Sequence, residues 1–220
     1  MLFRKRTSAA DFADRLIQLH ATLFGRDTLL SDKLQITLKG QELATALSEW
    51  LFFGAYVIRQ GVSARCRENG ALRDAILDAF FDQMYAGLRR AGVKESDMPH
   101  VEDCIRARFR NYEGAQSTSH SDPAYGLGRV ASTLIFGEGV AAIDFATVAG
   151  LHYADSVERV KRYFDDYRIA SEKTLTRSEL ATCHRRSVIL PCSTTSISAK
   201  VRCRRMLALL WLRIGEVVGC

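Results

Sequence analysis

Residues 69–92 read NGALRDAILDAFFDQMYAGLRRAG, and this stretch decides the fold. Its apolar side chains recur every three to four residues, which is the helical period, at Leu72, Ile76, Phe80, Met84 and Leu88. Asn69 is a residue type that caps helix starts, and Gly92 is the type that most often ends a helix in a left-handed conformation. The pattern therefore predicts a helix between Asn69 and Gly92 with one buried face.

A second helix is expected directly after the first. Ser96 or Asp97 can cap it, Pro99 falls in its first turn, and its inner stripe consists of Val101, Ile105, Phe109 and Tyr112. Two helices joined by a short glycine-containing turn are typical of an antiparallel helical hairpin. We therefore predict an all-α fold, a single multi-helix bundle built around this hairpin.

The rest of the chain supplies further helices. Helical periodicity extends over residues 8–25, 41–60, 123–136 and 140–171, and the last of these is one helix or two broken near Gly150. The polar run 113–121 is expected to be a loop. For residues 26–40 the sequence allows a loop, an irregular helix or a short strand. The strand is included because apolar and polar residues alternate from Leu34 to Leu38.

The net charge of +6 is unevenly distributed. Residues 177–220 hold eight Lys and Arg against two Asp and Glu, which accounts for the whole excess. Four of the six cysteines also lie there, without the Cys-x-x-Cys spacing of a zinc or redox site. We therefore expect a helical domain over residues 1–176 and a basic, cysteine-rich tail over 177–220, in a reducing, cytoplasmic compartment.

The tail ends in a short apolar segment. Met206 to Val218 is apolar except for Arg213 and Glu216, and these thirteen residues are too few to span a bilayer. A basic stretch followed by an apolar helix can lie in a membrane interface, which would make the protein peripheral to the inner membrane. The alternative is that the tail is foreign to the domain, for example through a changed reading frame.

Motifs of catalysis are missing from the sequence. It contains no Gly-x-Ser-x-Gly, no phosphate-binding loop, no dinucleotide fingerprint and no His-Glu-x-x-His, so we expect no enzyme and no cofactor. His152 and Asp155, one helical turn apart, could bind a metal with a residue from another helix, but the surrounding basic residues favour helix-surface ion pairs instead. The basic residues at positions 106, 108 and 110 are expected to form a solvated face and not a specific nucleic-acid site.

Several residues of the two central helices follow a family pattern. They are Asp78, Phe80, Phe81 and Met84 on the first helix, Gly92 in the turn, and Pro99 and Phe109 on the second helix. Across roughly thirty residues without a gap, this pattern resembles the ubiquinol–cytochrome c reductase chaperone family. The resemblance implies a helical assembly chaperone that binds newly made cytochrome b during assembly of the cytochrome bc complex.

Large aromatic side chains are the expected contacts with such a client, because aromatic residues supply most interface energy. The candidates are Trp50, Phe52, Phe53 and Tyr85. The first three lie in the stretch from Trp50 to Ile58, which is apolar nearly all round. Such a segment is either the central helix of the bundle or a core helix with one face open to a partner.

Overall fold

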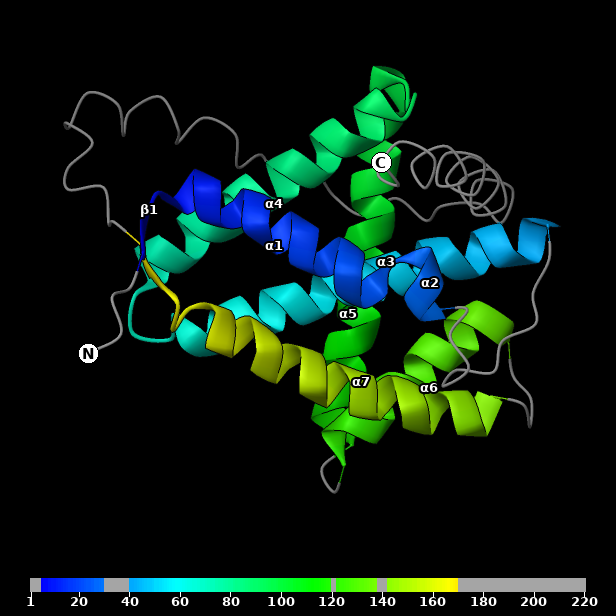
Figure 1. Ribbon diagram of the computed structural model, residues 1–220. Helices are drawn as coiled ribbons and strands as arrows, with labels where there is room; N and C mark the ends of the chain where they lie inside the picture. Colours follow the sequence, from blue (N-terminus) through cyan, green and yellow to red (C-terminus); the bar gives the residue numbers. More distant parts are fainter. Residues whose placement is uncertain (1–4, 30–39, 120–121, 138–141, 170–220) are drawn as a thin grey trace.

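The computed structural model describes residues 5–29, 40–119, 122–137 and 142–169, and they form the predicted all-α bundle (Figure 1). Its helices are α1 (Ala9–Phe24), the short α2 (Arg26–Leu29), α3 (Gly40–Arg65), α4 (Gly70–Arg90), α5 (Met98–Thr118), α6 (Pro123–Phe136) and α7 (Ala142–Tyr163). A 3-10 turn, Glu95–Asp97, precedes α5, and two three-residue strands, β1 (Lys5–Thr7) and β2 (Tyr167–Ile169), pair in parallel.

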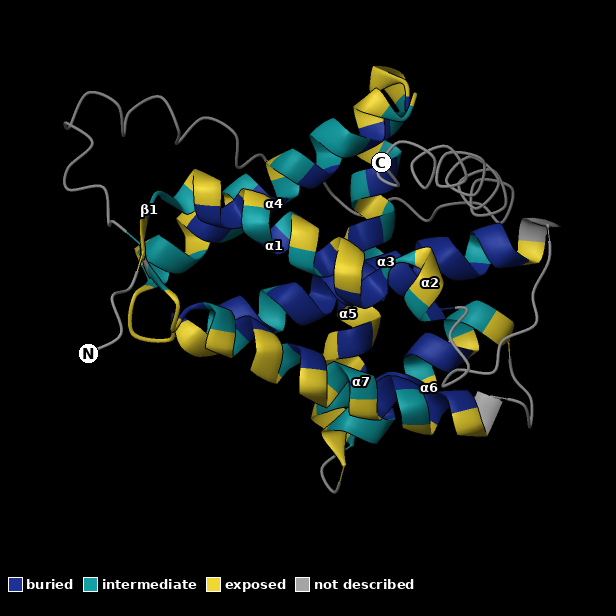
Figure 2. Ribbon diagram, in the orientation of Figure 1, coloured by how far each residue is buried: buried dark blue, intermediate teal, exposed yellow. Residues whose placement is uncertain are grey.

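Helix α3 forms the centre of the bundle. Every residue from Leu51 to Ile58 is buried, and α1, α4, α5, α6 and α7 all contact this helix (Figure 2). The side chains of Trp50, Phe53 and Tyr56 are completely buried. Of the two interpretations of this apolar segment, the structure therefore supports the central core helix.

The side-chain caps at the starts of α1, α4 and α6 are confirmed, whereas Asp97 stands at the start of α5 without a capping hydrogen bond from its side chain. The side-chain oxygens of Ser8, Asn69 and Asp122 accept hydrogen bonds from backbone N–H groups three residues ahead, at 2.9–3.1 Å. Each bond satisfies a donor that the first turn of a helix leaves without an intrahelical partner. Pro123 follows its cap in the first turn of α6, and Pro99 lies in the first turn of α5, as expected.

Gly92 ends α4 as predicted, with a φ angle of +98°. Its N–H bonds to the carbonyl of Arg89 at 2.9 Å, and the N–H of Val93 bonds to the carbonyl of Leu88 at 3.1 Å. This pair of bonds is the Schellman motif, and the buried side chains of Leu88 and Val93 supply the apolar contact that accompanies it.

The two helices joined at Gly92 are consecutive, but each has its most extensive contact with a different helix. Helix α4 packs chiefly along α1, whereas α5 packs chiefly against α6, and the two diverge from the turn (Figure 1). They still touch through Phe81 and Phe109, whose ring centroids are 5.9 Å apart. Apolar surface on other helices, and not the partner across the turn, thus determines how the predicted hairpin packs.

Residues 113–118 are helical, so the loop predicted there is wrong. Gln116 accepts a hydrogen bond from the Tyr56 hydroxyl and donates one to the Tyr153 hydroxyl, both at 2.8 Å, which ties the end of α5 to α3 and α7. The Thr118 hydroxyl bonds back to the carbonyl of Gly114 at 2.9 Å. These tertiary and local bonds hold a polar segment helical although its composition favours a loop.

Helix α7 is continuous through Gly150 and ends at Tyr163, eight residues before the predicted end. It crosses α6 so closely that a Cβ atom at Gly128 would lie 1.9 Å from the carbonyl oxygen of Ala146. A Cβ atom at Gly150 would in turn lie 2.7 Å from the carbonyl oxygen of Ala124. Glycine lowers the intrinsic stability of a helix, but at positions 128 and 150 the missing side chain allows α6 and α7 to pack this closely.

Three expectations lie outside the described residues. These are the alternating segment Leu34–Leu38, the domain boundary after Thr176 and the whole tail 177–220. Within the described ranges, no helix is both long and apolar enough to cross a membrane.

Gly92→Ala tests the helix stop. A Cβ atom at Gly92 would meet no atom within 4 Å, so the cost comes from the left-handed backbone alone, and we expect a loss of about 1–2 kcal/mol in the free energy of unfolding. Gly114→Ala is the matched control, because it also meets no neighbour but lies within α5. It should raise the free energy of unfolding by roughly 0.5–1 kcal/mol. Urea denaturation measures both, and equal changes would contradict the assigned stop.

Candidate client-binding surface

The residues of the family pattern divide between the core and the surface. Phe80 and Met84 are buried on the inner face of α4, and the Phe80 ring meets His20 of α1 edge-to-face at 6.0 Å. Phe109 is buried against Tyr56, with ring centroids 5.5 Å apart. These residues fix α4 and α5 to the rest of the bundle.

A half-buried apolar stripe runs along the outer edge of α4. It consists of Leu77, Phe81 and Tyr85, which are four residues apart and therefore lie in a row on the helix. We call these three residues the α4 stripe. Phe81 connects it to the core, because its ring contacts Phe80 at 5.3 Å and Phe109 at 5.9 Å. Its side chains are thus held in place by the core while part of each stays accessible.

Charged groups border the α4 stripe. The pKa of Tyr85 is raised to about 12, chiefly by burial and also by the nearby Glu102, while Arg106 opposes the shift. The hydroxyl therefore stays neutral at physiological pH. Asp78 and Asp82 lie beside the stripe on α4, and the pKa of Asp78 is raised by partial burial and by the adjacent carboxylates of Asp74 and Asp82. An apolar centre with a charged border is the usual anatomy of a protein interface.

Of the four aromatic residues predicted to contact a client, only Tyr85 is accessible. Trp50, Phe52 and Phe53, which were predicted to contact a partner, are buried in α3 and covered by neighbouring helices in this arrangement. Trp50 packs against Phe24 at 5.2 Å and Phe53 packs against Tyr112 at 5.4 Å between ring centroids. Their segment is apolar on every side because neighbouring helices surround it.

His152 and Asp155 each have other partners among the described residues. The His152 ring stacks on Trp50 at 5.3 Å, and its Nε2 bonds to the carbonyl of Leu23 at 2.8 Å, near the end of α1. Asp155 is exposed and pairs with Arg159 at 2.7 Å. Across the described part of the chain, no group of three or more His, Cys, Asp or Glu residues is placed to hold a metal ion.

A buried histidine, His20, joins α1 to α3. The Nε2 of His20 lies 3.0 Å from the carbonyl oxygen of Leu51, and since a carbonyl only accepts, the bond places the ring proton on Nε2. Burial lowers the pKa of His20 to about 4, and the hydrogen bond to Leu51 only partly opposes this shift. His20 is therefore neutral at physiological pH and acts as a packing residue.

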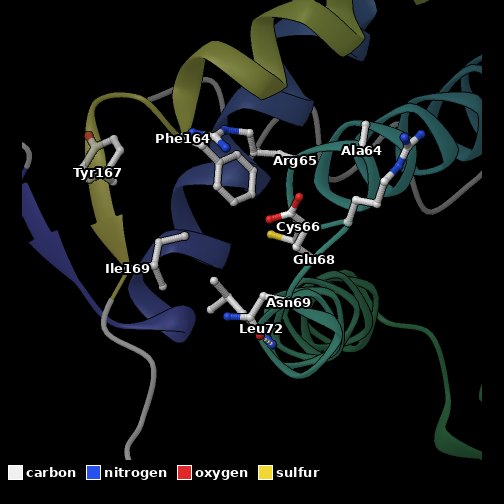
Figure 3. Close-up of a pocket in the computed structure, with 10 residues that line it drawn as sticks. Ala64, Arg65, Cys66, Glu68, Asn69, Leu72, Phe164, Tyr167 and Ile169 are labelled. Carbon is white, nitrogen blue, oxygen red and sulfur yellow. Dashed lines mark hydrogen bonds between the residues drawn. The ribbon is translucent and has the colours of Figure 1, made fainter.

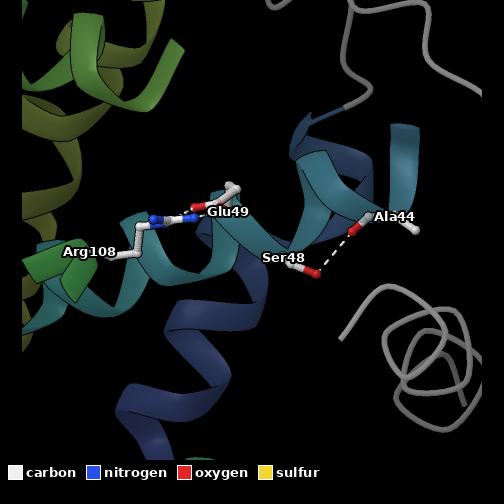
Figure 4. A network of polar contacts seen from close by, with 4 residues as sticks. All are labelled: Ala44, Ser48, Glu49 and Arg108. Carbon is white, nitrogen blue, oxygen red and sulfur yellow. Dashed lines mark hydrogen bonds and ion pairs between the residues drawn. The ribbon is translucent and has the colours of Figure 1, made fainter. Parts of the chain in front are cut away.

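The structure divides the predicted cluster of three arginines. Arg108 forms a largely buried, bidentate ion pair with Glu49 of α3 (Figure 4). The side chain of Glu49 is 4% exposed. Arg106 instead pairs at the surface with Asp103 at 2.9 Å, and Arg110 is exposed. The sequence holds no signal for the Glu49–Arg108 pair, because its members are 59 residues apart.

Two grooves open elsewhere on the described surface. The larger, of about 600 Å³, lies between the end of α3, the start of α4 and β2, and its lining includes Cys66, Leu72, Phe164 and Ile169 (Figure 3). Burial raises the pKa of the Cys66 thiol, although Arg65 and Arg73 oppose the shift, so this thiol is a poor nucleophile. A smaller groove of about 460 Å³ lies between α5 and α6.

No protein-family model matches the chain, and neither the curated proteins nor the solved structures include a significant match.

Arg108→Met tests the buried ion pair. It leaves the Glu49 carboxylate buried without a counter-charge, and we expect the free energy of unfolding to fall by about 2–4 kcal/mol. Glu49→Met combined with Arg108→Met should recover most of that loss, because no unpaired charge remains. Arg106→Met removes an exposed pair and should cost less than about 1 kcal/mol. Equal losses for Arg106→Met and Arg108→Met in urea denaturation would contradict the assignment.

The buried His20 predicts an acid-sensitive fold. The pKa of His20 in the folded protein, about 4, lies below the ordinary histidine value of 6.5, so this contribution to stability is complete above pH 6.5 and is lost as the pH falls towards 4. We expect a loss of about 3 kcal/mol across this window from His20 alone. Urea denaturation at several pH values measures it. His20→Gln should flatten the slope while His100→Gln should retain it, and equal slopes in both variants would contradict this account.

Proposed function

We propose that this chain is a non-enzymatic assembly chaperone that binds newly made cytochrome b, and that the α4 stripe contacts the client. The observation that carries the proposal is the accessible row of Leu77, Phe81 and Tyr85 on the helix whose residues resemble the ubiquinol–cytochrome c reductase chaperone family. The stripe belongs to a well-packed helix, so it presents apolar surface without needing the fold to open.

Such a stripe suits an apolar helical client. Side chains at four-residue spacing match the ridges of a second helix, which can lie along α4 and cover them. Phe81 and Tyr85 carry large apolar area with few rotatable bonds, so their binding costs little side-chain entropy. Asp78 and Asp82 at the edge favour a client whose apolar segment is flanked by Lys or Arg.

The proposed mechanism is coverage of surface. A membrane subunit outside its bilayer exposes apolar helices that associate with one another, and burying one of them on the chaperone lowers that tendency. No bond is made or broken in this mechanism, so it requires only reversible contact and release. Release would follow when another surface of the assembling complex competes for the same apolar face.

A deletion strain tests the client. Loss of the gene should lower the amount of cytochrome b and of assembled bc complex, measured from haem absorption spectra and native gels of membranes. A plasmid-borne wild-type copy should restore both. Unchanged cytochrome b in the deletion strain would contradict the proposal.

Variants of the α4 stripe test the surface. Leu77→Ala combined with Tyr85→Ala should weaken co-purification of cytochrome b by about 30-fold or more, the effect of losing about 2 kcal/mol at an interface centre. Tyr125→Ala is the matched control, because it removes another half-buried tyrosine, on α6. Circular dichroism verifies that each variant is folded. Wild-type binding by the stripe variant would show that the client binds elsewhere.

A further inference from the structure

The groove between α5 and α6 combines apolar surface with polar donors. Its six described lining residues include no acid, and they are Arg110, Asn111 and Gly114 of α5 and Val130, Thr133 and Leu134 of α6. Val130 and Leu134 are half-buried and pack against the core, so they supply apolar surface that the core holds in place. The other side chains of the groove are polar and exposed, and they surround this apolar part.

The polar side chains of the groove lack partners within the described part of the chain. Arg110 forms no ion pair there, and the side chains of Asn111 and Thr133 form no hydrogen bond. Arg129, one helical turn before Thr133 on α6, is also exposed and forms no ion pair with a described residue. Two arginines, an amide and a hydroxyl thus offer hydrogen-bond donors to a ligand that binds here.

The acids of α5 closest to the groove are already engaged by other arginines. Asp103, on the preceding turns of the helix, pairs with Arg106 at 2.9 Å. Glu113 pairs with Arg59 of α3 at 2.6 Å. No described carboxylate pairs with the arginines at the groove, so their positive charge is available to an acidic ligand.

The groove is short, which limits what it can hold. Its lining covers about one turn of each helix, residues 110–114 and 130–134, or roughly 6 Å along each axis. Its volume of about 460 Å³ suits one or two large side chains and not the length of a second helix. A Cβ atom at Gly114 would meet no atom within 4 Å, so a bound backbone can approach α5 closely at this position.

We propose that this groove binds a short acidic segment of a partner protein. One large apolar side chain of the segment covers Val130 and Leu134, and its carboxylates lie beside Arg110 and Arg129. A guanidinium group can donate two parallel hydrogen bonds to a carboxylate, which gives the contact direction as well as charge attraction. The site uses no residue of the α4 stripe, and it does not rest on the proposed function.

Two synthetic peptides test the charge preference with the full-length chain. The probe is a fluorescently labelled peptide of sequence Glu-Glu-Leu-Phe-Glu-Glu with blocked ends, and its counterpart carries Lys in place of every Glu. Fluorescence anisotropy at low ionic strength should show that the acidic peptide binds at least about tenfold more tightly. Equal affinities, or tighter binding of the basic peptide, would overturn the proposal.

Charge variants separate the groove from the net charge of +6, which attracts any acidic peptide. Arg110→Gln combined with Arg129→Gln should lower the affinity for the acidic peptide at least about fivefold. Arg67→Gln combined with Arg162→Gln removes the same charge from two other exposed positions and should change the affinity less than about twofold. Equal losses in the two double variants would show that the peptide responds to net charge and not to this site.

Filling the groove tests the position of the peptide without changing charge. Gly114→Met adds a side chain where α5 has open space, and it should lower the affinity at least about fivefold by occupying the groove. Gly87→Met on α4 is the matched control, because a Cβ atom there would meet only the end of the Arg90 side chain, at 4.0 Å. Circular dichroism verifies that both variants are folded. Wild-type affinity in Gly114→Met would place the peptide elsewhere and contradict the proposal.

Competition tests whether the groove selects a peptide or any polyanion. A single-stranded oligonucleotide with the same number of negative charges lacks the apolar anchor, so it should displace the acidic peptide only at a concentration at least about tenfold higher than unlabelled peptide requires. Displacement at equal concentration would contradict recognition of a peptide segment.

None of these measurements requires cytochrome b. Normal cytochrome b in the deletion strain, together with peptide binding that depends on Arg110, Arg129 and Gly114, would contradict the proposed function and leave the groove site standing. Loss of cytochrome b in that strain without such peptide binding would contradict the groove site and leave the client surface standing.

Discussion

The fold depends on how closely other helices approach α3. A Cβ atom at Gly54 would lie 2.4 Å from the Phe24 ring of α1, and one at Gly61 would lie 2.6 Å from Val160 of α7. Neither site has room for a larger side chain without displacing a neighbouring helix. Because α1 and α7 cross α3 at these two glycines, they bring the aromatic side chains of the three helices into one core. The positions of α1 and α7 on α3 therefore depend on these two crossings.

The core joins its helices by polar contacts as well as by apolar packing. His20 and His152 each bond to a backbone carbonyl of another helix, and Gln116 connects tyrosines from α3 and α7. Such bonds have angular requirements that dispersion contacts lack, so they favour one packing of the helices over alternatives. The Glu49–Arg108 pair acts in the same way between α3 and α5, although its net contribution to stability is smaller than the cost of breaking it.

This arrangement gives α4 two separate roles. Its inner face, with Ile76, Phe80 and Leu88, is buried and anchors the helix along α1. Its outer edge carries the α4 stripe, which the core holds in place through the ring of Phe81. A binding surface attached to a rigid core loses little entropy when it is covered, which suits repeated binding and release.

The sequence by itself determined the helical class, the helix caps at Ser8, Asn69 and Asp122, and the stop at Gly92, because each depends on atoms within a few residues. The tertiary structure decided the rest. Periodicity identified the apolar residues of α3 but could not tell an open face from one covered on all sides, so Trp50 and Phe53 were expected at an interface. The helical state of residues 113–118 depends on Tyr56 and Tyr153, and the Glu49–Arg108 pair joins distant segments. Contacts between residues far apart in the chain leave no local pattern, and only the packed helices bring them together.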